Sequence, residues 1–265
     1  MSIITLTSDM GIKDFYLASI KGAIYSAYPE ARIVDITHHI TPFDIAQAAF
    51  ILKNTYRDFP ENTVHIISVD PEPSQQSQHV AIYMHGQYFI GNDNGIFSLL
   101  FDEVPEQIYK LKAPSNLGSS SFPSKSVFVW AATLLAQGSR LEDIGERTNN
   151  IRMRVAFRPV IEPDVIKGSV IFIDGYGNVI TNIDKKLFES IQEGRKYTIF
   201  FRGENYGINR ISESYNEVPP GEKLAIFGAG DFLEIAINKG VEGSGGGANK
   251  LFGLKLNDIV RIEFH

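Results

Sequence analysis

Strand-like and helix-like segments alternate through the first 70 residues of the chain. Short apolar runs rich in Ile, Val and Thr occupy 2–7, 32–36 and 63–69. Between them lie two stretches with apolar residues at helical spacing: one opens at Asp14, and the other follows Pro42, a residue suited to a helix start. Consecutive strand, helix and strand segments predict a parallel sheet that is covered by helices.

Further elements extend this pattern into a complete N-terminal domain. Two shorter strands at 80–84 and 88–90 and a helix at 126–137 complete an α/β domain that we place at 1–155. The segment 156–166 contains two prolines, which interrupt regular structure, and it predicts a linker.

The chain changes character after the linker. Strand-like runs follow one another with few helices between them, at 170–173, 197–201, 224–227, 233–237 and 259–264. This predicts a smaller C-terminal β-barrel domain at 167–265, so the fold class is α/β with a mainly parallel N-terminal sheet and a separate barrel. The glycine-rich stretch 243–247 lacks the Gly-Lys-Ser/Thr ending of a phosphate-binding loop and predicts a flexible surface loop.

Charge and composition exclude several classes of partner. The net charge of −6 argues against nucleic acid as the main partner, which requires a basic surface. The chain has no cysteine, which excludes disulfides, thiolate metal sites and a thiol nucleophile. It has neither a signal-peptide pattern at its start nor an apolar stretch long enough to span a bilayer, so we expect no membrane partner and a cytoplasmic location.

Carboxylates follow the ends of two predicted parallel strands. Asp9 comes after the first strand and Asp70 after the third, and ligands of such sheets bind beyond the carboxyl ends of the strands. A carboxylate at Asp9 can accept hydrogen bonds from both hydroxyls of a ribose, and Asp70 can act as a base or orient a water. The alternative interpretation is that Asp9 caps a turn, Asp14 caps the following helix and Asp70 caps a strand end.

Two other groups of residues suggest ligands. His38 and His39 are adjacent on an extended segment and point to opposite sides, so they do not easily share an ion, and we predict no metal site. The loop 174–178 offers Asp174 and Asn178 to a polar ligand and Tyr176 to a planar ring. The alternative is an ordinary hairpin turn, because Gly and Asn favour such turns.

Short motifs extend over nearly the whole chain in a recognisable order. They lie at 7–11, 21–22, 34–38, 41–44, 59–60, 63–65, 69–71, 92–95, 174–182 and 233–238. In this order they resemble the S-adenosyl-L-methionine (SAM) hydroxide adenosyltransferases, relatives of the fluorinase and chlorinase enzymes. The resemblance implies a SAM-binding N-terminal α/β domain and a C-terminal β-barrel. It also implies a homotrimer with active sites between subunits, SAM or adenosine as ligand, and no further cofactor.

The resemblance also implies roles for single residues. Asp9, and with it Asp14, would hold the ribose hydroxyls, and Phe43 would pack near the ribose and the sulfonium. The C-terminal domain would supply contacts to the methionine part from Asp174 and Asn178 and to adenine from Tyr176. The segment 227–232 would line the adenine pocket through its backbone, with the residues Phe227, Ala229 and Phe232.

The chain departs from the resemblance at the catalytic residues. The hydroxide-using members carry an Asp-Arg-His triad; Asp70 fits its first position, whereas Ser77 and Pro123 occupy the other two. Ser124 matches a serine that helps the fluorinase bind halide, but Asp70 and Pro73 replace the tyrosine and threonine of that halide site. A carboxylate at Asp70 repels a halide, which favours water over halide as nucleophile.

Three functions therefore stay open from the sequence. The first is a SAM hydrolase, in which water attacks the ribose C5′ with Asp70 as catalytic residue and gives adenosine and methionine. The second is a binding protein that keeps the nucleoside pocket but has weakened chemistry. The third, ranked below the others, is a halide-dependent adenosyltransferase.

Overall fold

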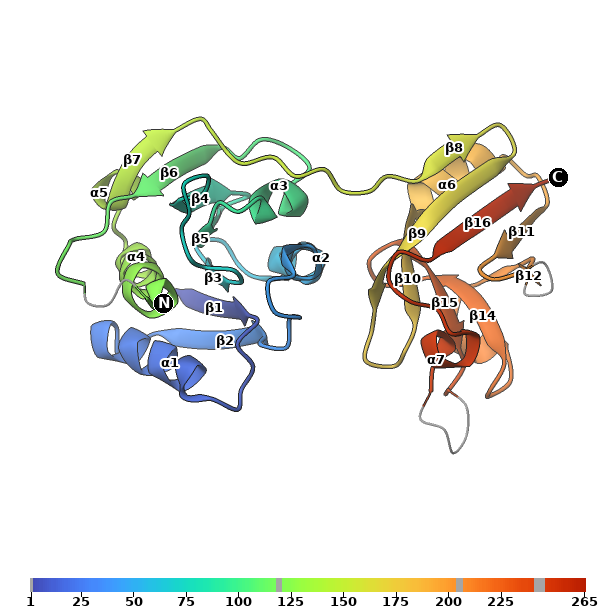
Figure 1. Cartoon of the computed structure of the whole chain (residues 1–265), viewed down its shortest axis with the longest axis horizontal. Coiled ribbons are helices and arrows are strands. Elements are labelled where there is room, and N and C mark those ends of the chain that lie inside the picture. The colour runs from blue at the N-terminus through green and yellow to red at the C-terminus, as the bar shows by residue number, and fades with distance from the viewer. Residues whose placement is uncertain (1, 118–120, 204–206, 241–245) are drawn as a thin grey trace. The chain divides into compact units, whose positions relative to one another are not determined.

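The computed structural model describes residues 2–117, 121–203, 207–240 and 246–265 (Figure 1). The chain divides into two compact units, unit 1 at 1–155 and unit 2 at 156–265, each with its own hydrophobic core.

Unit 1 is built on a seven-stranded sheet in its described part. The strands, in spatial order, are β2 (Arg32–Thr37), β1 (Ile3–Ser8), β3 (Val64–Ser68), β5 (Gln87–Asn92), β4 (His79–Met84), β6 (Gln107–Leu111) and β7 (Gly145–Thr148). The first four run parallel and the last three are added antiparallel. The prediction of a mainly parallel sheet is thus confirmed, with an antiparallel extension.

Helices cover both faces of this sheet. α1 (Phe15–Ala27) and α4 (Val129–Ala136) pack on one face, where their apolar residues join those of β1 and β3 in one core. α2 (Ile45–Lys53) and α3 (Ile96–Leu100) cover a second core on the other face, and the short α5 (Leu141–Ile144) precedes β7. Figure 1 shows the sheet between these helices.

The start of α2 differs from the sequence prediction. The helix begins at Ile45 rather than at Pro42, because the side chain of Asp44 accepts a hydrogen bond of 2.9 Å from the backbone N–H of Gln47. Pro42 lies instead in the turn before the helix.

Unit 2 contains a nine-stranded sheet in its described part. Its main path is β12 (Gly207–Ile208), β11 (Tyr197–Phe200), β16 (Ile259–Phe264), β9 (Val165–Ile173), β10 (Val179–Asp184), β15 (Phe232–Ile237), β14 (Lys223–Phe227) and β13 (Ile211–Ser212), and β8 (Val160–Glu162) pairs with β9. The sheet curls into an almost closed barrel around its own core, which confirms the predicted barrel (Figure 1).

Unit 2 also holds elements that the sequence analysis did not predict. α6 (Lys185–Gln192) buries Phe188 against the barrel, and α7 (Ala248–Phe252) follows the glycine-rich segment. Within the predicted linker 156–166, the structure has β8 and the first residues of β9. Gly243 to Gly245 of the predicted surface loop lie outside the described residues.

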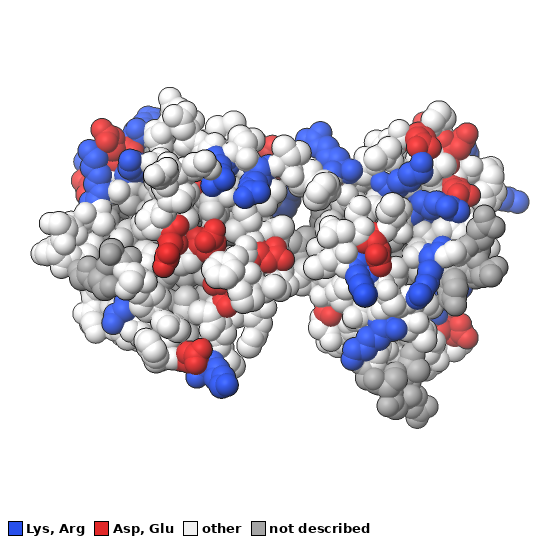
Figure 2. All heavy atoms as spheres, viewed as in Figure 1, with Lys and Arg blue, Asp and Glu red and all other residues white. Residues whose placement is uncertain are grey.

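The surface carries both signs of charge. Figure 2 shows Lys and Arg interspersed with Asp and Glu on the visible face of each unit. Within the described part of the chain, none of the helices is long and apolar enough to cross a membrane.

Candidate functional site

Asp9 organises the loops at the carboxyl edge of the unit 1 sheet. Its carboxylate accepts a hydrogen bond of 2.9 Å from the backbone N–H of Phe43. Two residues further on, the N–H of Gly11 donates to the carbonyl of His38 at 2.8 Å, and Gly11 has a φ of 68° that suits glycine. Asp9 thus connects the loop after β1 to the loop that leads into α2.

Phe43 is held in a conformation that large side chains avoid. Its φ is 67°, and 72% of its surface is exposed. An aromatic residue that is both strained and exposed gains nothing from packing in this state, and such strain is concentrated at ligand sites. The backbone N–H of Phe43 is fixed by the Asp9 carboxylate, and its side chain is left exposed beyond this contact.

Asp14 stands at the N-terminus of α1 but does not cap it. The residue has the extended backbone of an N-cap, yet its side chain accepts no hydrogen bond from the helix. It is exposed to solvent, so the helix leaves its carboxylate accessible.

Asp70 lies two residues beyond the end of β3 and is also strained. Its φ is 46°, and its backbone carbonyl accepts hydrogen bonds from the side-chain amides of Asn92 and Asn94 at 3.0 and 3.1 Å. Among the described residues the Asp70 carboxylate has no hydrogen-bond partner. The two asparagines therefore hold the backbone and leave the carboxylate half-buried and accessible for other contacts.

Ser124 is fully buried at the same edge. Its hydroxyl lies 2.5 Å from that of Ser68, the last residue of β3. Ser124 opens a π-helical turn, Ser124–Phe128, that leads into α4. Such turns are rare and are frequent at functional sites. Ser124 is thus brought to the strand end that carries Asp70.

Two buried oxygens at this edge have no partner among the described residues. They are Thr7 Oγ1, near the end of β1, and Asn92 Oδ1, at the end of β5. Buried polar atoms are almost always hydrogen-bonded in folded proteins, so such atoms mark places for ordered water or ligand.

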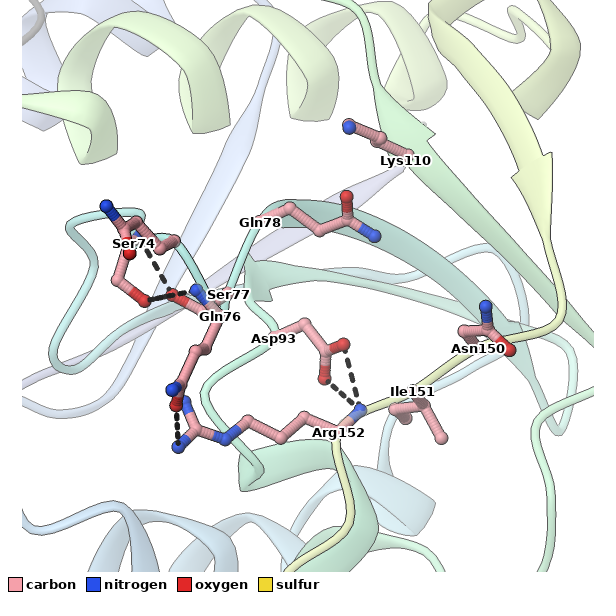
Figure 3. Close-up of a pocket in the computed structure, with 10 residues that line it drawn as sticks. Ser74, Gln76, Ser77, Gln78, Asp93, Lys110, Asn150, Ile151 and Arg152 are labelled. Atoms are coloured by element: carbon pink, nitrogen blue, oxygen red, sulfur yellow. Dashed lines mark hydrogen bonds between the residues drawn. The ribbon is translucent and has the colours of Figure 1, made fainter.

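A polar pocket of about 500 Å³ lies beside the segment that contains Ser77 (Figure 3). Asp93 accepts two contacts of 3.0 and 2.9 Å from the backbone N–H of Arg152, and the Arg152 guanidinium reaches Gln76 at 3.4 Å. Burial raises the pKa of Asp93, and the contact with Arg152 opposes this rise. The residues that line this pocket do not include Asp9, Asp70 or Ser124. The pocket is therefore separate from these three residues at the carboxyl edge of the sheet.

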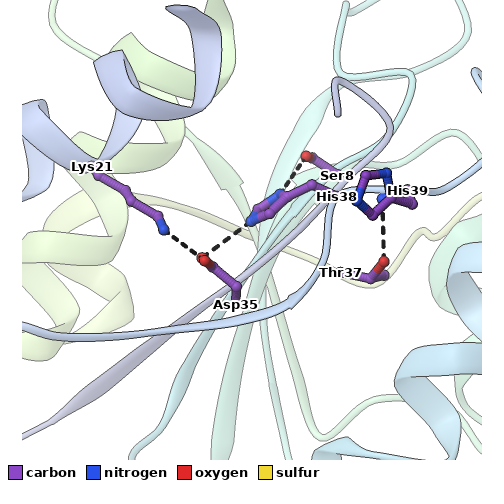
Figure 4. Close-up of polar contacts among 6 residues, drawn as sticks. All are labelled: Ser8, Lys21, Asp35, Thr37, His38 and His39. Atoms are coloured by element: carbon purple, nitrogen blue, oxygen red, sulfur yellow. Dashed lines mark hydrogen bonds and ion pairs between the residues drawn. The ribbon is translucent and has the colours of Figure 1, made fainter. Parts of the chain in front are cut away.

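A second polar network joins the ends of β1 and β2 (Figure 4). The hydroxyl of Ser8 lies 2.7 Å from His38 Nδ1, and His38 Nε2 lies 3.1 Å from Asp35 Oδ1, within ion-pair distance although not aligned as a hydrogen bond. Lys21 donates to Asp35 Oδ2 at 2.6 Å. Burial raises the pKa of Asp35, but the close contacts with Lys21 and His38 and the charges of these two residues outweigh it and lower the pKa.

In unit 2, Asp174 holds its own loop together. Its carboxylate accepts hydrogen bonds from the backbone N–H groups of Tyr176 and Asn178 and from the Asn178 amide, at 2.9, 2.8 and 3.0 Å. The loop leaves the Tyr176 ring 85% exposed while Asn178 is buried. The loop is therefore a well-defined turn that presents an aromatic ring.

The described end of the glycine-rich segment packs against this loop. A Cβ at Gly247 would overlap the carbonyl of Tyr176, and the N–H of Asn249 donates to the carbonyl of Gly177 at 3.0 Å. Asn249 Oδ1 is buried and has no partner among the described residues. Position 247 thus requires glycine, because the backbone there approaches the backbone of the loop 174–178 closely. The repetitive sequence alone does not indicate this requirement.

The segment 227–232 forms the hairpin turn between β14 and β15. Phe227 packs on Phe188 in the barrel core, Phe232 is half-buried and Ala229 is exposed. A Cβ at Gly228 would overlap the carboxylate of Glu234, which accepts a hydrogen bond of 2.9 Å from Tyr215.

Glu234 lies between the loop 174–178 and the turn 227–232 of unit 2. Burial raises the pKa of Glu234; the hydrogen bond from Tyr215 opposes this rise, and the nearby charge of Asp174 adds to it. Burial and the charge of Glu234 in turn raise the pKa of the Tyr215 hydroxyl. Loop 174–178 and turn 227–232 are therefore neighbours across one buried carboxylate that the sequence analysis missed.

Family models and known proteins match most of the chain, in both units. The models of the SAM hydroxide adenosyltransferase N-terminal and C-terminal domains match residues 4–145 and 168–261. The chain belongs to the SAM hydroxide adenosyltransferase family. It is 32% identical to the (R)-S-adenosyl-L-methionine hydrolase of Methanocaldococcus jannaschii, over 89% of this chain and 88% of that protein.

Two further proteins are similar to this chain at lower identity. A fluorinase from Nocardia brasiliensis is 26% identical over 72% of this chain and 74% of its own. The crystal structure of an uncharacterized conserved protein from Thermotoga maritima superposes with a TM-score of 0.86 at 26% identity and covers 98% of this chain and 99% of its own.

The sequence pattern indicates the residues that follow strands but not their partners in the fold. Ser8 ends β1 and His38 follows β2, and the position of both residues at the ends of neighbouring parallel strands is the sequence signal for their contact. In the described ranges, no group of three or more His, Cys, Asp or Glu residues is arranged to hold a metal.

Proposed function

We propose that this chain hydrolyses SAM to adenosine and L-methionine, with the (R)-sulfonium epimer among its substrates. The observation that carries the proposal is the match to four proteins named (R)-S-adenosyl-L-methionine hydrolase, which are 27 to 32% identical to this chain over 89 to 98% of its length. The fluorinases match a smaller part, 69 to 72% of the chain. This difference favours water over halide as the nucleophile.

The half-buried carboxylate of Asp70 supports the chemistry. SAM carries a positive sulfonium, and its charge disappears when water attacks C5′ and methionine leaves as a neutral thioether. The site therefore has to hold water in line with the C–S bond and remove a proton from it. Asp70 lies at the strand edge with its backbone fixed by Asn92 and Asn94 and its carboxylate unoccupied by described residues.

Substrate binding is assigned to both units. In unit 1, Asp9 would hold the ribose hydroxyls, Asp14 would assist from the adjacent turn, and Phe43 would cover the ribose and sulfonium. In unit 2, Asp174 and Asn178 would meet the methionine part, and Tyr176 with the turn 227–232 would meet adenine. The three hydrogen bonds that Asp174 receives from its own loop support a role in shaping this subsite.

The wider assignments follow from the family resemblance and stay predictions. They are a homotrimer with sites at subunit interfaces, a reaction without cofactor, and a cytoplasmic location. The trimer predicts a mass of three chains in light scattering, and a clean monomer mass at working concentration would contradict it.

The proposal is tested by incubating the purified chain with SAM in halide-free buffer and separating the products by chromatography. We expect adenosine and methionine in equal amounts, from the (R) as well as the (S) sulfonium epimer. Product formed only when chloride or fluoride is added would indicate the halide-dependent reaction. Adenosine binding without any product would indicate the binding protein instead.

A further inference from the structure

We propose that His79 is a positioning residue for Asp70, which it holds in place through the backbone carbonyl of Pro71. This chain has Ser77 and Pro123 where the hydroxide-using members of the family have an arginine and a histidine. The effect of His79 on rate rests on the proposed hydrolysis, in which Asp70 takes the proton of the attacking water and His79 exchanges none. The effect of His79 on the backbone does not depend on that reaction.

The backbone at Asp70 is strained for two reasons. Its φ is 46°, in the left-handed region that residues other than glycine avoid. The next residue is Pro71, and a residue before proline favours the extended region. Strain of this kind persists only where the surrounding structure holds the backbone firmly. The contacts of the segment 69–72 therefore decide how the Asp70 carboxylate is placed.

Side chains hold four consecutive backbone carbonyls, those of the segment 69–72. The Asn94 amide donates to the first and second at 3.2 and 3.1 Å, and the Asn92 amide donates to the second and fourth at 3.0 and 2.8 Å. His79 Nε2 lies 2.9 Å from the third, the carbonyl of Pro71. Because a carbonyl oxygen only accepts hydrogen bonds, Nε2 carries the hydrogen of the neutral ring and donates it.

The bond at Pro71 acts on Asp70 because the chain between the two residues is nearly rigid. The peptide bond that joins them is trans and planar. The proline ring locks the φ of Pro71. One torsion, the ψ of Asp70, therefore sets where the Pro71 carbonyl carbon lies relative to the Asp70 Cα. By holding this carbonyl, His79 restricts the torsion that the strained aspartate would otherwise change.

The fold in turn holds the His79 ring. His79 is the first residue of β4 and the register partner of Asn92 in β5, so both side chains lie on the same face of the sheet. The ring meets Phe128 edge to face, with centroids 5.0 Å apart and planes at 84°, and Phe128 is fully buried. Burial lowers the pKa of His79, and the hydrogen bond to Pro71 opposes this shift. The ring is therefore neutral at pH 7 and presents one fixed donor to the carbonyl.

The test compares His79→Gln with His79→Asn in steady-state hydrolysis of SAM. The amide nitrogen of glutamine reaches about as far as Nε2 and can donate to Pro71, whereas the shorter asparagine does not reach it. We expect His79→Gln to keep a kcat close to that of the parent. We expect His79→Asn to lower kcat by about 10- to 100-fold with KM unchanged, because a misplaced catalytic group costs rate and Asp70 is not assigned to substrate binding.

His85 provides a matched control at the opposite end of β4. It directly follows that strand, and its Nδ1 lies 3.1 Å from the Tyr56 hydroxyl, so it is also a half-buried histidine with a hydrogen bond of its own. His85→Asn should keep the parent kcat.

Action through Asp70 is tested in the Asp70→Asn background. The general base is already lost there, so His79→Asn should lower kcat no further. Equal losses in both backgrounds would show that His79 acts independently and would overturn the inference. A parent-like kcat in His79→Asn would overturn it as well. Equal losses in His79→Gln and His79→Asn would do the same, because they would indicate that the ring only packs against Phe128.

Unfolding in urea tests the same contact without catalysis. Asp70→Gly relieves the strained φ and should raise the urea midpoint of the parent. In His79→Asn the backbone is free to relax, so the same substitution should raise the midpoint less. Equal gains in both backgrounds would overturn the inference whether or not the chain hydrolyses SAM. A parent that binds adenosine but forms none would overturn the proposed hydrolysis alone, and the urea midpoints would then decide whether His79 holds Asp70.

Discussion

The carboxylate of Asp9 holds the backbone N–H of Phe43 at 2.9 Å, and this single hydrogen bond accompanies a φ of 67° at an exposed aromatic residue. One carboxylate oxygen is thus used to shape the loop before α2, and the other has no hydrogen-bond partner among the described residues. A ribose diol would complete the coordination of this group.

Asp9→Ala is expected to weaken adenosine binding by about 1.5–3 kcal/mol, because hydrogen bonds to a charged group are worth about that much. Asp9→Asn is the matched control, since its amide oxygen still accepts from Phe43 but lacks the charge. Calorimetry with adenosine should rank the affinities parent, Asn, Ala. Unchanged affinity in Asp9→Ala would remove Asp9 from the site.

Phe43→Gly should increase stability and decrease affinity at the same time. Glycine adopts a positive φ without strain, and strain at such a position costs about 1–3 kcal/mol, while an exposed ring contributes little to the core. Because glycine also loses more chain entropy on folding, the net gain should be nearer 1 kcal/mol. Urea unfolding measures the first effect and adenosine calorimetry the second; a variant that loses stability and keeps affinity would show that Phe43 serves the fold.

Asp70→Asn should lower adenosine formation by about 10²-fold or more, because an amide does not take up the proton that the attacking water releases. Glu72→Gln is the control: it removes a carboxylate two residues away that is exposed to solvent. A rate in Asp70→Asn equal to that of the parent would show that water is activated elsewhere.

The sequence predicted the elements that local pattern determines. The apolar segments in strand-like and helix-like spacing correctly indicate β1, α1, β2, α2 and β3, and with them the sheet edge at which Asp9 and Asp70 both lie. The predicted start of α2 at Pro42 is wrong. The hydrogen bond that the Asp44 side chain accepts from Gln47 fixes the first turn at Ile45, whereas proline is only compatible with a helix start. α6 was missed because it is short and buries little beyond Phe188.

The partners of the site residues depend on long-range contacts, which local pattern does not encode. Ser124 reaches Ser68 across 56 positions of the chain, and Tyr215 reaches Glu234 across 19 positions. The π-helical turn that buries Ser124 also has no signature in the spacing of apolar residues. Roles of single residues therefore came from the family resemblance and not from periodicity.

Buried His65 should make stability fall in mild acid. Burial lowers its pKa from 6.5 to about 4, so the folded chain binds this proton less readily than the unfolded chain. Stability is complete above the unfolded pKa of 6.5 and is lost as pH falls toward 4. Between pH 7 and pH 5 the loss from this group is about 2 kcal/mol. Denaturant unfolding at both values should show a loss smaller by that amount in His65→Asn, and an equal loss in parent and variant would contradict the prediction.

The origin of the oxygen in the product tests the central claim most directly. We would incubate the chain with SAM in ¹⁸O-enriched, halide-free water and analyse the adenosine by mass spectrometry. Attack of water on C5′ predicts one ¹⁸O atom per adenosine, located in the 5′ hydroxyl, with methionine unlabelled at sulfur. Adenosine that carries no ¹⁸O, or a complete absence of adenosine from an intact protein that binds it, would contradict the account.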